Sequence, residues 1–280
     1  MSLLASCCNT VLEGVVSAVS LQETLKFLNQ TSKIETVGSV LLLNGFIFGG
    51  SLMVRDFLMF PLIFDPLTRW FAGGDGDEGE QLLVKEFSQQ MFNILLLVPI
   101  FILSNLLNIV WCSEIVEDAF KKAHAGQKRP PPRPAQENIR EELYRAAFFL
   151  VLIVQSFLCL MLLPRPIGAM VDFIQQCFLL AFYCYDYGWA LQGLKFQARL
   201  DKFQSHWLFM LGFGMPLSLI SSALPMFWGY MLSSLLFPFC AILAIQRPPK
   251  KHSRGWDSMQ TFRFAQFITL HLIKFVTSKF

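Results

Sequence analysis

Among the side chains in the apolar parts of this sequence that could do chemistry, several carboxamides and carboxylates lie close together. Two groups fall at helical spacing, which places the members of each group on one face of a helix. Such groups are costly in apolar surroundings and often mark solute paths. They predict either a hydrophilic path or a set of hydrogen bonds between helices. The predicted path is lined by Asn105, Asn108, Asp172, Gln175 and Gln176, with Ser104 beside the first group.

Two further pairs are predicted from their distance to a proline-flanked turn at Arg165. Gln155 precedes Arg165 by as many residues as Gln175 follows it, so the two amides should lie at similar depth in a helical hairpin. The same counting places Arg145 level with Asp186, which predicts an interfacial ion pair. Both pairs are interpreted as contacts that hold the hairpin together rather than as reacting groups.

Signatures of catalysis are absent from the sequence. The four histidines are scattered without ligand spacing, and no phosphate-binding glycine loop or Ser/His/Asp arrangement is visible. The basic segments also contain acidic residues, which argues against nucleic-acid binding. We therefore expect no enzymatic activity, no metal and no cofactor.

Long apolar runs must position these polar residues. Hydrophobic residues make up 54% of the chain and charged residues 15%, and the run Trp207–Ile245 carries no charged residue. Such runs are typical of membrane-crossing helices. The sequence predicts an all-α integral membrane protein of about six transmembrane or half-penetrating helices arranged as hairpins. The expected crossings are 37–60, 91–112, 146–163, 167–190, 207–223 and 226–245.

The flanks of the membrane region divide the chain into three parts. Residues 1–35 form a cytosolic amphipathic segment with a surface helix at 11–28, residues 36–246 form the membrane domain, and residues 247–280 form a basic interfacial segment. Basic residues gather in 113–145, 192–206 and 247–256, which predicts that these segments and both termini are cytosolic. Charge counting does not distinguish full crossings from half-depth hairpins at 146–190 and 207–245. Cys7 and Cys8, beside the amphipathic helix, are candidates for palmitoylation.

The Pro-rich centre of the 113–145 loop has two readings. A proline run of this kind favours an extended, semi-rigid spacer. Lys128, Pro131 and Pro134 also match a basic ligand for grooves of the SH3 type, so cytosolic proteins are candidate partners beside the lipid bilayer. A homo-oligomer is a further prediction.

Two features of the first crossing carry packing predictions. Gly45 and Gly49 form a GxxxG pattern that would permit close helix contact, although glycine is common in membrane helices. Arg55 and Asp56 are adjacent, and adjacent residues do not face each other on an α-helix. We therefore expect these two side chains either to reach separate partners or to extend to the membrane interface.

A family resemblance is carried by several runs between residues 35 and 246. The most specific are Ala181–Trp189, which reads AFYCYDYGW, and Leu211–Leu217, which reads LGFGMPL. Further matching residues are Asn108–Trp111, Ile115–Phe120, Arg199–Leu200, Trp207 and Leu236–Pro238. With these runs the chain resembles the etoposide-induced membrane proteins, which are eukaryotic relatives of the bacterial CysZ sulfate permeases.

The resemblance implies more than the residues alone do. Eukaryotic members are endoplasmic reticulum proteins linked to autophagy and to growth suppression or apoptosis, which implies a non-enzymatic role in forming autophagosomes or autolysosomes. The CysZ relatives admit sulfate through a helical bundle with half-penetrating hairpins. A sulfate or anion permease and a membrane-shaping hairpin protein are therefore the alternatives. Residues 1–36 contain only two basic residues, unlike the Arg-rich N-terminal segment of some relatives.

Overall fold

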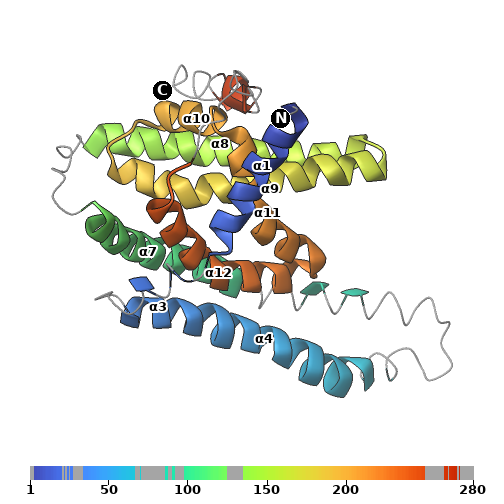
Figure 1. Cartoon of the computed structure of the whole chain (residues 1–280). Coiled ribbons are helices and arrows are strands. Elements are labelled where there is room, and N and C mark those ends of the chain that lie inside the picture. The colour runs from blue at the N-terminus through green and yellow to red at the C-terminus, as the bar shows by residue number, and fades with distance from the viewer. Residues whose placement is uncertain are drawn as a thin grey trace. The chain divides into compact units, whose positions relative to one another are not determined.

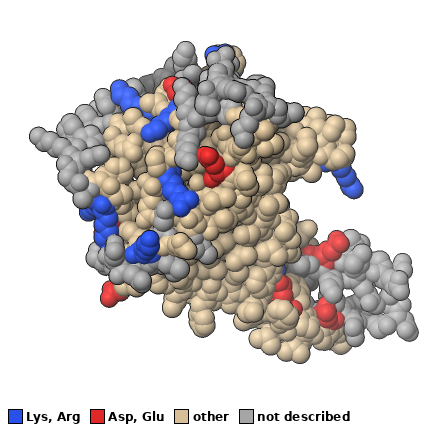
Figure 2. Space-filling model, in the orientation of Figure 1, with Lys and Arg blue, Asp and Glu red and all other residues tan. Residues whose placement is uncertain are grey.

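The computed structural model is helical, with no strand among the residues that it describes (Figure 1). It holds four helices long and apolar enough to cross a membrane, or five if one bent pair counts as a single crossing. Figure 2 shows few charged side chains on a mostly uncharged face. The prediction of an all-α membrane protein is therefore confirmed. The described residues are 3–20, 22, 24, 26–27, 34–66, 70, 86–87, 90–91, 98–124, 135–249, 262–263, 265–269 and 271.

The ends of the candidate crossings lie within about five residues of those predicted from the sequence. The four candidate crossings are Ile34–Ile63, Glu141–Leu162, Arg165–Leu191 and Phe227–Gln246. The bent pair joins Phe196–Gln204 to Trp207–Ala223 at an angle of 93°. The remaining predicted crossing, 91–112, lies partly outside the described residues.

The chain divides into two compact units, which are described separately. Unit 1 comprises Met1–Thr31, Val116–Leu219 and Phe239–Phe280. Unit 2 comprises Ser32–Ile115 and Ile220–Pro238.

Unit 1 is built on an antiparallel hairpin of α8 (Ala135–Leu162) and α9 (Arg165–Leu191), which lie side by side in Figure 1. Helix α9 begins directly after Pro164, and the missing N–H of Pro166 is tolerated in a first turn. It ends at Leu191, and Gly193, whose φ is 77°, follows its C-cap and donates its N–H to Ala190 O at 2.9 Å. The N–H of Leu194 reaches Trp189 O at 3.2 Å. These two bonds turn the chain sharply into α10 (Phe196–Gln204).

Aromatic rings form the core of unit 1. Phe148, Phe182 and Phe203 are at most 1% exposed, and they come from α8, α9 and α10. Phe262, in the C-terminal segment, joins them with ring centroids 5.5 Å from Phe148 and 5.2 Å from Phe203. The C-terminal segment was expected to lie at the membrane interface. One face of its described part reaches the core through Phe262, whereas Phe267 is 61% exposed, so the place of this segment at the membrane interface stays a prediction.

Helix α1 (Leu3–Ala18) packs against α11 (Trp207–Ala223) through glycines. A Cβ on Gly14 would collide with the backbone at Phe209 and Phe213, and one on Gly212 would collide with the backbone of Val11. The bounds of α1 therefore differ from those of the helix predicted at 11–28, and its place on the membrane surface stays a prediction. The helix starts earlier and ends at Ala18, and one face is buried because two glycines allow the backbones to touch.

Two segments predicted as loops are largely helical. Helix α7 (Val98–Ala123) continues well past residue 112, and α8 begins at Ala135, so both ends of the 113–145 segment are helix. The 192–206 segment contains α10, which buries Phe196, Leu200 and Phe203. The spacing of these three apolar residues is helical and was overlooked beside the basic residues.

Unit 2 contains an unusual first crossing. Helices α3 (Ile34–Leu41) and α4 (Gly49–Met53) alternate with two π-helical stretches, η1 (Leu42–Phe48) and η2 (Val54–Phe64). Phe48 and Leu52 are fully buried in this unit, against side chains that include Trp228 and Met231 of α12 (Met226–Gln246). A Cβ on Gly49 would meet Met231 Sδ, whereas one on Gly45 would lie 3.5 Å from Leu235 Cδ2. The GxxxG glycines therefore face flexible side chains of α12, not a second backbone.

Candidate functional site

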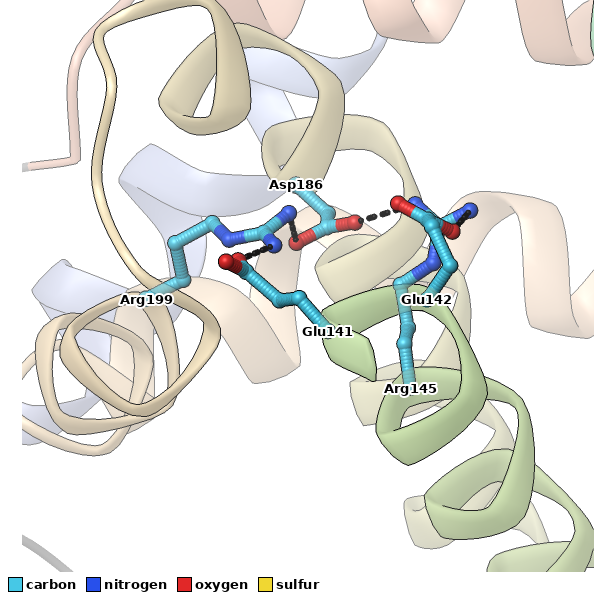
Figure 3. Close-up of polar contacts among 5 residues, drawn as sticks. All are labelled: Glu141, Glu142, Arg145, Asp186 and Arg199. Carbon is cyan, nitrogen blue, oxygen red and sulfur yellow. Dashed lines mark hydrogen bonds and ion pairs between the residues drawn. The ribbon is translucent and has the colours of Figure 1, made fainter. Parts of the chain in front are cut away.

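The most elaborate polar arrangement lies in unit 1, where α8, α9 and α10 meet (Figure 3). Asp186 of α9 is at its centre. Its Oδ2 accepts a hydrogen bond from Arg145 Nη1 at 3.0 Å, and its Oδ1 accepts one from Arg199 Nη1 at 2.5 Å. Arg199 Nη2 also donates to Glu141 Oε1 at 2.5 Å, and Arg145 Nη2 pairs with Glu142 Oε2 at 2.6 Å. We call these five residues the ion cluster.

Burial is uneven across the ion cluster. The side chains of Asp186 and Arg199 are 3% and 2% exposed, whereas those of Arg145 and Glu142 are 22% and 56% exposed. A buried charge is tolerated only when it is paired and hydrogen-bonded. Each Asp186 oxygen is therefore bonded to a different guanidinium. The more exposed Glu142 pairs with Arg145 on the solvent side of the cluster. This arrangement fixes α10 to the base of the hairpin and leaves neither Asp186 oxygen without a donor.

Sequence reasoning found only part of the ion cluster. It named Arg145 and Asp186, and the structure brings these two together. It missed Glu141, Glu142 and the pairing role of Arg199. A signal for Arg199 was present, because this arginine falls on the same helical face as the apolar Phe196 and Phe203. A lone cation on a buried face requires an acidic partner.

A second polar group lies along the α8–α9 hairpin. Asp172 accepts hydrogen bonds from Ser156 Oγ at 2.6 Å and from Gln176 Nε2 at 2.8 Å. Gln155 Nε2 donates to Gln175 Oε1 at 3.4 Å, and Gln175 Nε2 donates to the carbonyl of Leu152 at 2.5 Å. The predicted pair Gln155–Gln175 therefore lies in contact. The bonds of Ser156, Gln155 and Gln175 join α8 to α9, and Gln176 bonds to Asp172 within α9.

The third group belongs to unit 2 and centres on Asn44, which sequence reasoning missed. Asn44 is fully buried, and it exchanges hydrogen bonds of 2.8 and 2.9 Å with Asn108. Its Oδ1 also accepts a bond from Ser104 Oγ at 2.9 Å. We call these three residues the amide network. Asn44 lies in the π-helix η1, and π-helical turns are frequent at functional sites.

The expectation that Arg55 and Asp56 do not face each other was wrong, although each side chain also reaches a separate partner. Arg55 donates from Nε and Nη2 to the two Asp56 oxygens, at 2.6 and 3.1 Å, and its guanidinium also lies 5.8 Å from the centroid of the Phe227 ring. Both residues lie in the π-helix η2, whose wider turn differs from the α-helical geometry assumed. Trp228 Nε1 completes the site by donating to Asp56 Oδ2 at 3.0 Å. With Arg55 only 7% exposed, a local ion pair avoids leaving either charge alone in apolar surroundings.

The predicted polar path is distributed over both units. Asn108 is bonded within unit 2, and Asp172, Gln175 and Gln176 are bonded within unit 1. The side chain of Asn105 and the residues Lys128, Pro131 and Pro134 lie outside the described part of the structure. Among the described residues, no cluster of His, Cys, Asp or Glu has the geometry to hold a metal ion.

The sequence was compared with known protein families. The family model described as Sulfate transporter CysZ/Etoposide-induced protein 2.4 matches residues 20–228, which is most of the chain. The chain belongs to this family. The matched range includes all five residues of the ion cluster and all three of the amide network. The resemblance seen in the sequence is thereby confirmed.

Curated relatives of this CysZ/etoposide-induced family come from a plant, an amoeba and a nematode. The Protein EI24 homolog of Arabidopsis thaliana is 27% identical, covering 86% of this chain and 83% of the relative. The Protein EI24 homolog of Dictyostelium discoideum is 26% identical over 75% of this chain and 64% of its own. Ectopic P granules protein 4 of Caenorhabditis elegans is 33% identical over 53% of this chain and 47% of its own. No solved structure matches the chain.

Proposed function

We propose that this chain is a non-enzymatic protein of the endoplasmic reticulum membrane that acts in autophagy, in forming autophagosomes or autolysosomes. Membership of the CysZ/etoposide-induced family supports the proposal. The name of the nematode relative describes granules found out of place, as expected where cytoplasmic material is not cleared. Growth suppression or apoptosis, also implied by the resemblance, would follow from the same role.

The observation that carries the proposal is the closure of the ion cluster. Its charges are paired with each other, which is typical of a structural contact between helices, whereas a catalytic site needs a group free to react. The ion cluster holds the amphipathic helix α10 at the end of two apolar crossings. A surface helix fixed in this way offers a rigid platform for cytosolic proteins, with the 113–145 segment beside it in the sequence.

The experiment that tests this role is rescue of a knockout cell line. Cells lacking the protein should accumulate undegraded autophagic cargo, and the wild-type chain should restore cargo turnover. Asp186→Leu, which leaves two guanidinium groups without their shared partner, should fail to restore it at equal abundance in the membrane. Lys195→Met, at an exposed position just before α10, is the matched control and should restore it. Normal cargo turnover in the knockout would contradict the proposal.

The proposed topology places both termini in the cytosol and lets the α8–α9 hairpin cross the bilayer fully. From Arg165 to Asp186, α9 is roughly 31 Å long at the α-helical rise, close to the roughly 30 Å of a hydrocarbon core. Both charged positions would then reach an interface. In a Cys8→Ser background, Arg165→Cys should react with an impermeant maleimide from the lumenal side only. Protection from both sides would indicate a half-depth hairpin, as in the membrane-shaping alternative.

Transport of sulfate is the second candidate, favoured by the description of the matching family model. Asp172 is unfavourable for it, because a carboxylate repels an anion and its oxygens already accept bonds from Ser156 and Gln176. Sulfate uptake into liposomes that contain the purified protein would support this candidate. If uptake is unchanged in the Asp172→Ala/Asn108→Ala double variant, these residues do not line the path.

A further inference from the structure

Unit 1 contains a cavity of about 220 Å³ that none of the proposals above uses. It lies where the C-terminal ends of α7, α9 and α12 meet α10. Tyr185 and Trp189 of α9 line it together with Phe120 of α7, Lys202 of α10 and Gln246 of α12. Because α9 and α12 are candidate crossings, a cavity at their ends lies at the depth of lipid headgroups. Tyr and Trp are enriched at that depth.

One wall of the cavity is cationic. The ammonium of Lys202 lies 5.2 Å from the centroid of the Trp189 ring, and burial lowers the pKa of this amine. Within the described part of the chain, Lys202 forms no ion pair with a carboxylate. A partly buried ammonium that is held by an aromatic face and lacks an acidic neighbour is suited to an anionic ligand such as phosphate.

The remaining wall favours a hydrogen-bond donor with positive charge. Gln246 lines the cavity, and its Oε1 has no hydrogen-bond partner among the described residues. Three helices end at this place, and each helix C-terminus carries partial negative charge from its last carbonyl groups. An ammonium with several N–H donors satisfies both features. His124, also on the wall, is engaged with Phe120, since the two rings stack at 4.3 Å and Nδ1 lies 3.3 Å from the Phe120 carbonyl.

The size of the cavity restricts the ligand to a small group. A protein cavity of about 150 Å³ accommodates benzene, with its six heavy atoms. By proportion, 220 Å³ holds roughly nine, which fits phosphoethanolamine with its eight heavy atoms better than the bulkier phosphocholine. Gly188 keeps this space open, because a Cβ there would already lie 3.3 Å from Ile245 Cγ1.

We propose that this cavity binds the headgroup of phosphatidylethanolamine, with its phosphate at Lys202 and its ammonium at Gln246 and the helix-end carbonyls. The site is independent of the role in autophagy, so either proposal can fail without the other. It would hold an ordered lipid at the base of the helices that carry the ion cluster.

Native mass spectrometry of the purified full-length protein tests the proposal by titration with single lipids. Phosphatidylethanolamine should bind about tenfold more tightly than phosphatidylglycerol, which lacks the ammonium, and than phosphatidylcholine, which lacks its N–H donors. Equal binding of the three lipids would overturn the proposal. So would displacement of the lipid by inorganic phosphate at low millimolar concentration, which would indicate a site for free anions.

Variants separate the two halves of the site. Lys202→Met should weaken phosphatidylethanolamine binding about tenfold, whereas Lys202→Arg should retain it and Lys195→Met should leave it unchanged. Gln246→Leu should abolish the preference over phosphatidylglycerol while anionic binding persists. Gly188→Leu should block all three lipids by filling the cavity. Unchanged binding in Lys202→Met, with a melting temperature equal to that of wild type, would overturn the assignment.

Discussion

The ion cluster of unit 1 and the amide network of unit 2 differ in how they pair polar groups among apolar helices. Both place polar groups among apolar helices, where an unpartnered group is costly. The ion cluster uses full charges, and its outer members Arg145 and Glu142 reach solvent. The amide network is neutral and its centre, Asn44, is fully buried. Charge is therefore used where one edge is solvated, and neutral amides are used where burial is complete.

The surroundings of the glycines differ between unit 1 and the first crossing of unit 2. In unit 1, Gly14, Gly212 and Gly214 each face a neighbouring backbone. In the first crossing of unit 2, Gly45 and Gly49 face side chains of α12, which can move, whereas Gly229 of the same unit faces the backbone of Ser221. The glycines of α11 in unit 1 should therefore tolerate substitution less well than those of the first crossing in unit 2.

The largest effect is expected from Arg199→Met in the ion cluster. Removing one partner of a buried pair leaves an uncompensated charge, so the free energy of unfolding in mixed micelles should fall by about 3–5 kcal/mol. Arg145→Met removes a more exposed partner of the same carboxylate, at 22%, and should cost about 1 kcal/mol. SDS titration monitored by circular dichroism measures both values. Equal losses would show that burial does not set the strength of this cluster.

Gly214→Ala should have the next largest effect. Its Cβ would overlap the carbonyl of Cys177, so α9 and α11 must separate, at a cost of about 1–3 kcal/mol. In unit 2, Gly45→Ala meets only Leu235 Cδ2 at 3.5 Å and should be neutral or should stabilise by up to about 1 kcal/mol. SDS titration monitored by circular dichroism measures the change in unfolding free energy of both variants. A Gly45→Ala loss as large as that of Gly214→Ala would remove the contrast between the units.

Asn44→Leu should destabilise the amide network by about 1–2 kcal/mol. Side-chain hydrogen bonds in membranes are worth roughly 0.6 kcal/mol each, and Asn44 makes several with Ser104 and Asn108. Ser51→Ala, which removes only a local bond to the carbonyl of Ile47, is the control and should change little. If Asn44→Leu is as stable as wild type, the network is not what holds unit 2 together.

The smallest effect is expected from Gln155→Leu in the α8–α9 hairpin. Its bond to Gln175 is long, at 3.4 Å, so the loss should be at most about 0.6 kcal/mol. Gln175→Leu should cost about 1 kcal/mol, because Gln175 also donates to the carbonyl of Leu152. Thermal melting in detergent resolves the order of the two. A reversed order would show that the interhelical amide bond, not the backbone bond, dominates.

The bounds of α9 and α11 were nearly right from the sequence, because long apolar runs between prolines or polar residues leave few alternatives. The pairs at equal distance from Arg165 were also found, since a helical hairpin aligns residues by counting. Arg199 and Asn44 were missed for a common reason. Each bonds to residues far away in the chain, and no local pattern encodes which helices become neighbours.

The sequence by itself determined that this protein lies in a membrane, because its apolar runs are too long and too free of charge to be covered by the rest of the chain. It also determined the family, through the runs around Asp186 and Gly214. Only the tertiary structure decided which carboxylate meets which guanidinium and where a cavity remains. Those outcomes depend on distances between helices, and glycines and ring contacts scattered along the chain set these distances.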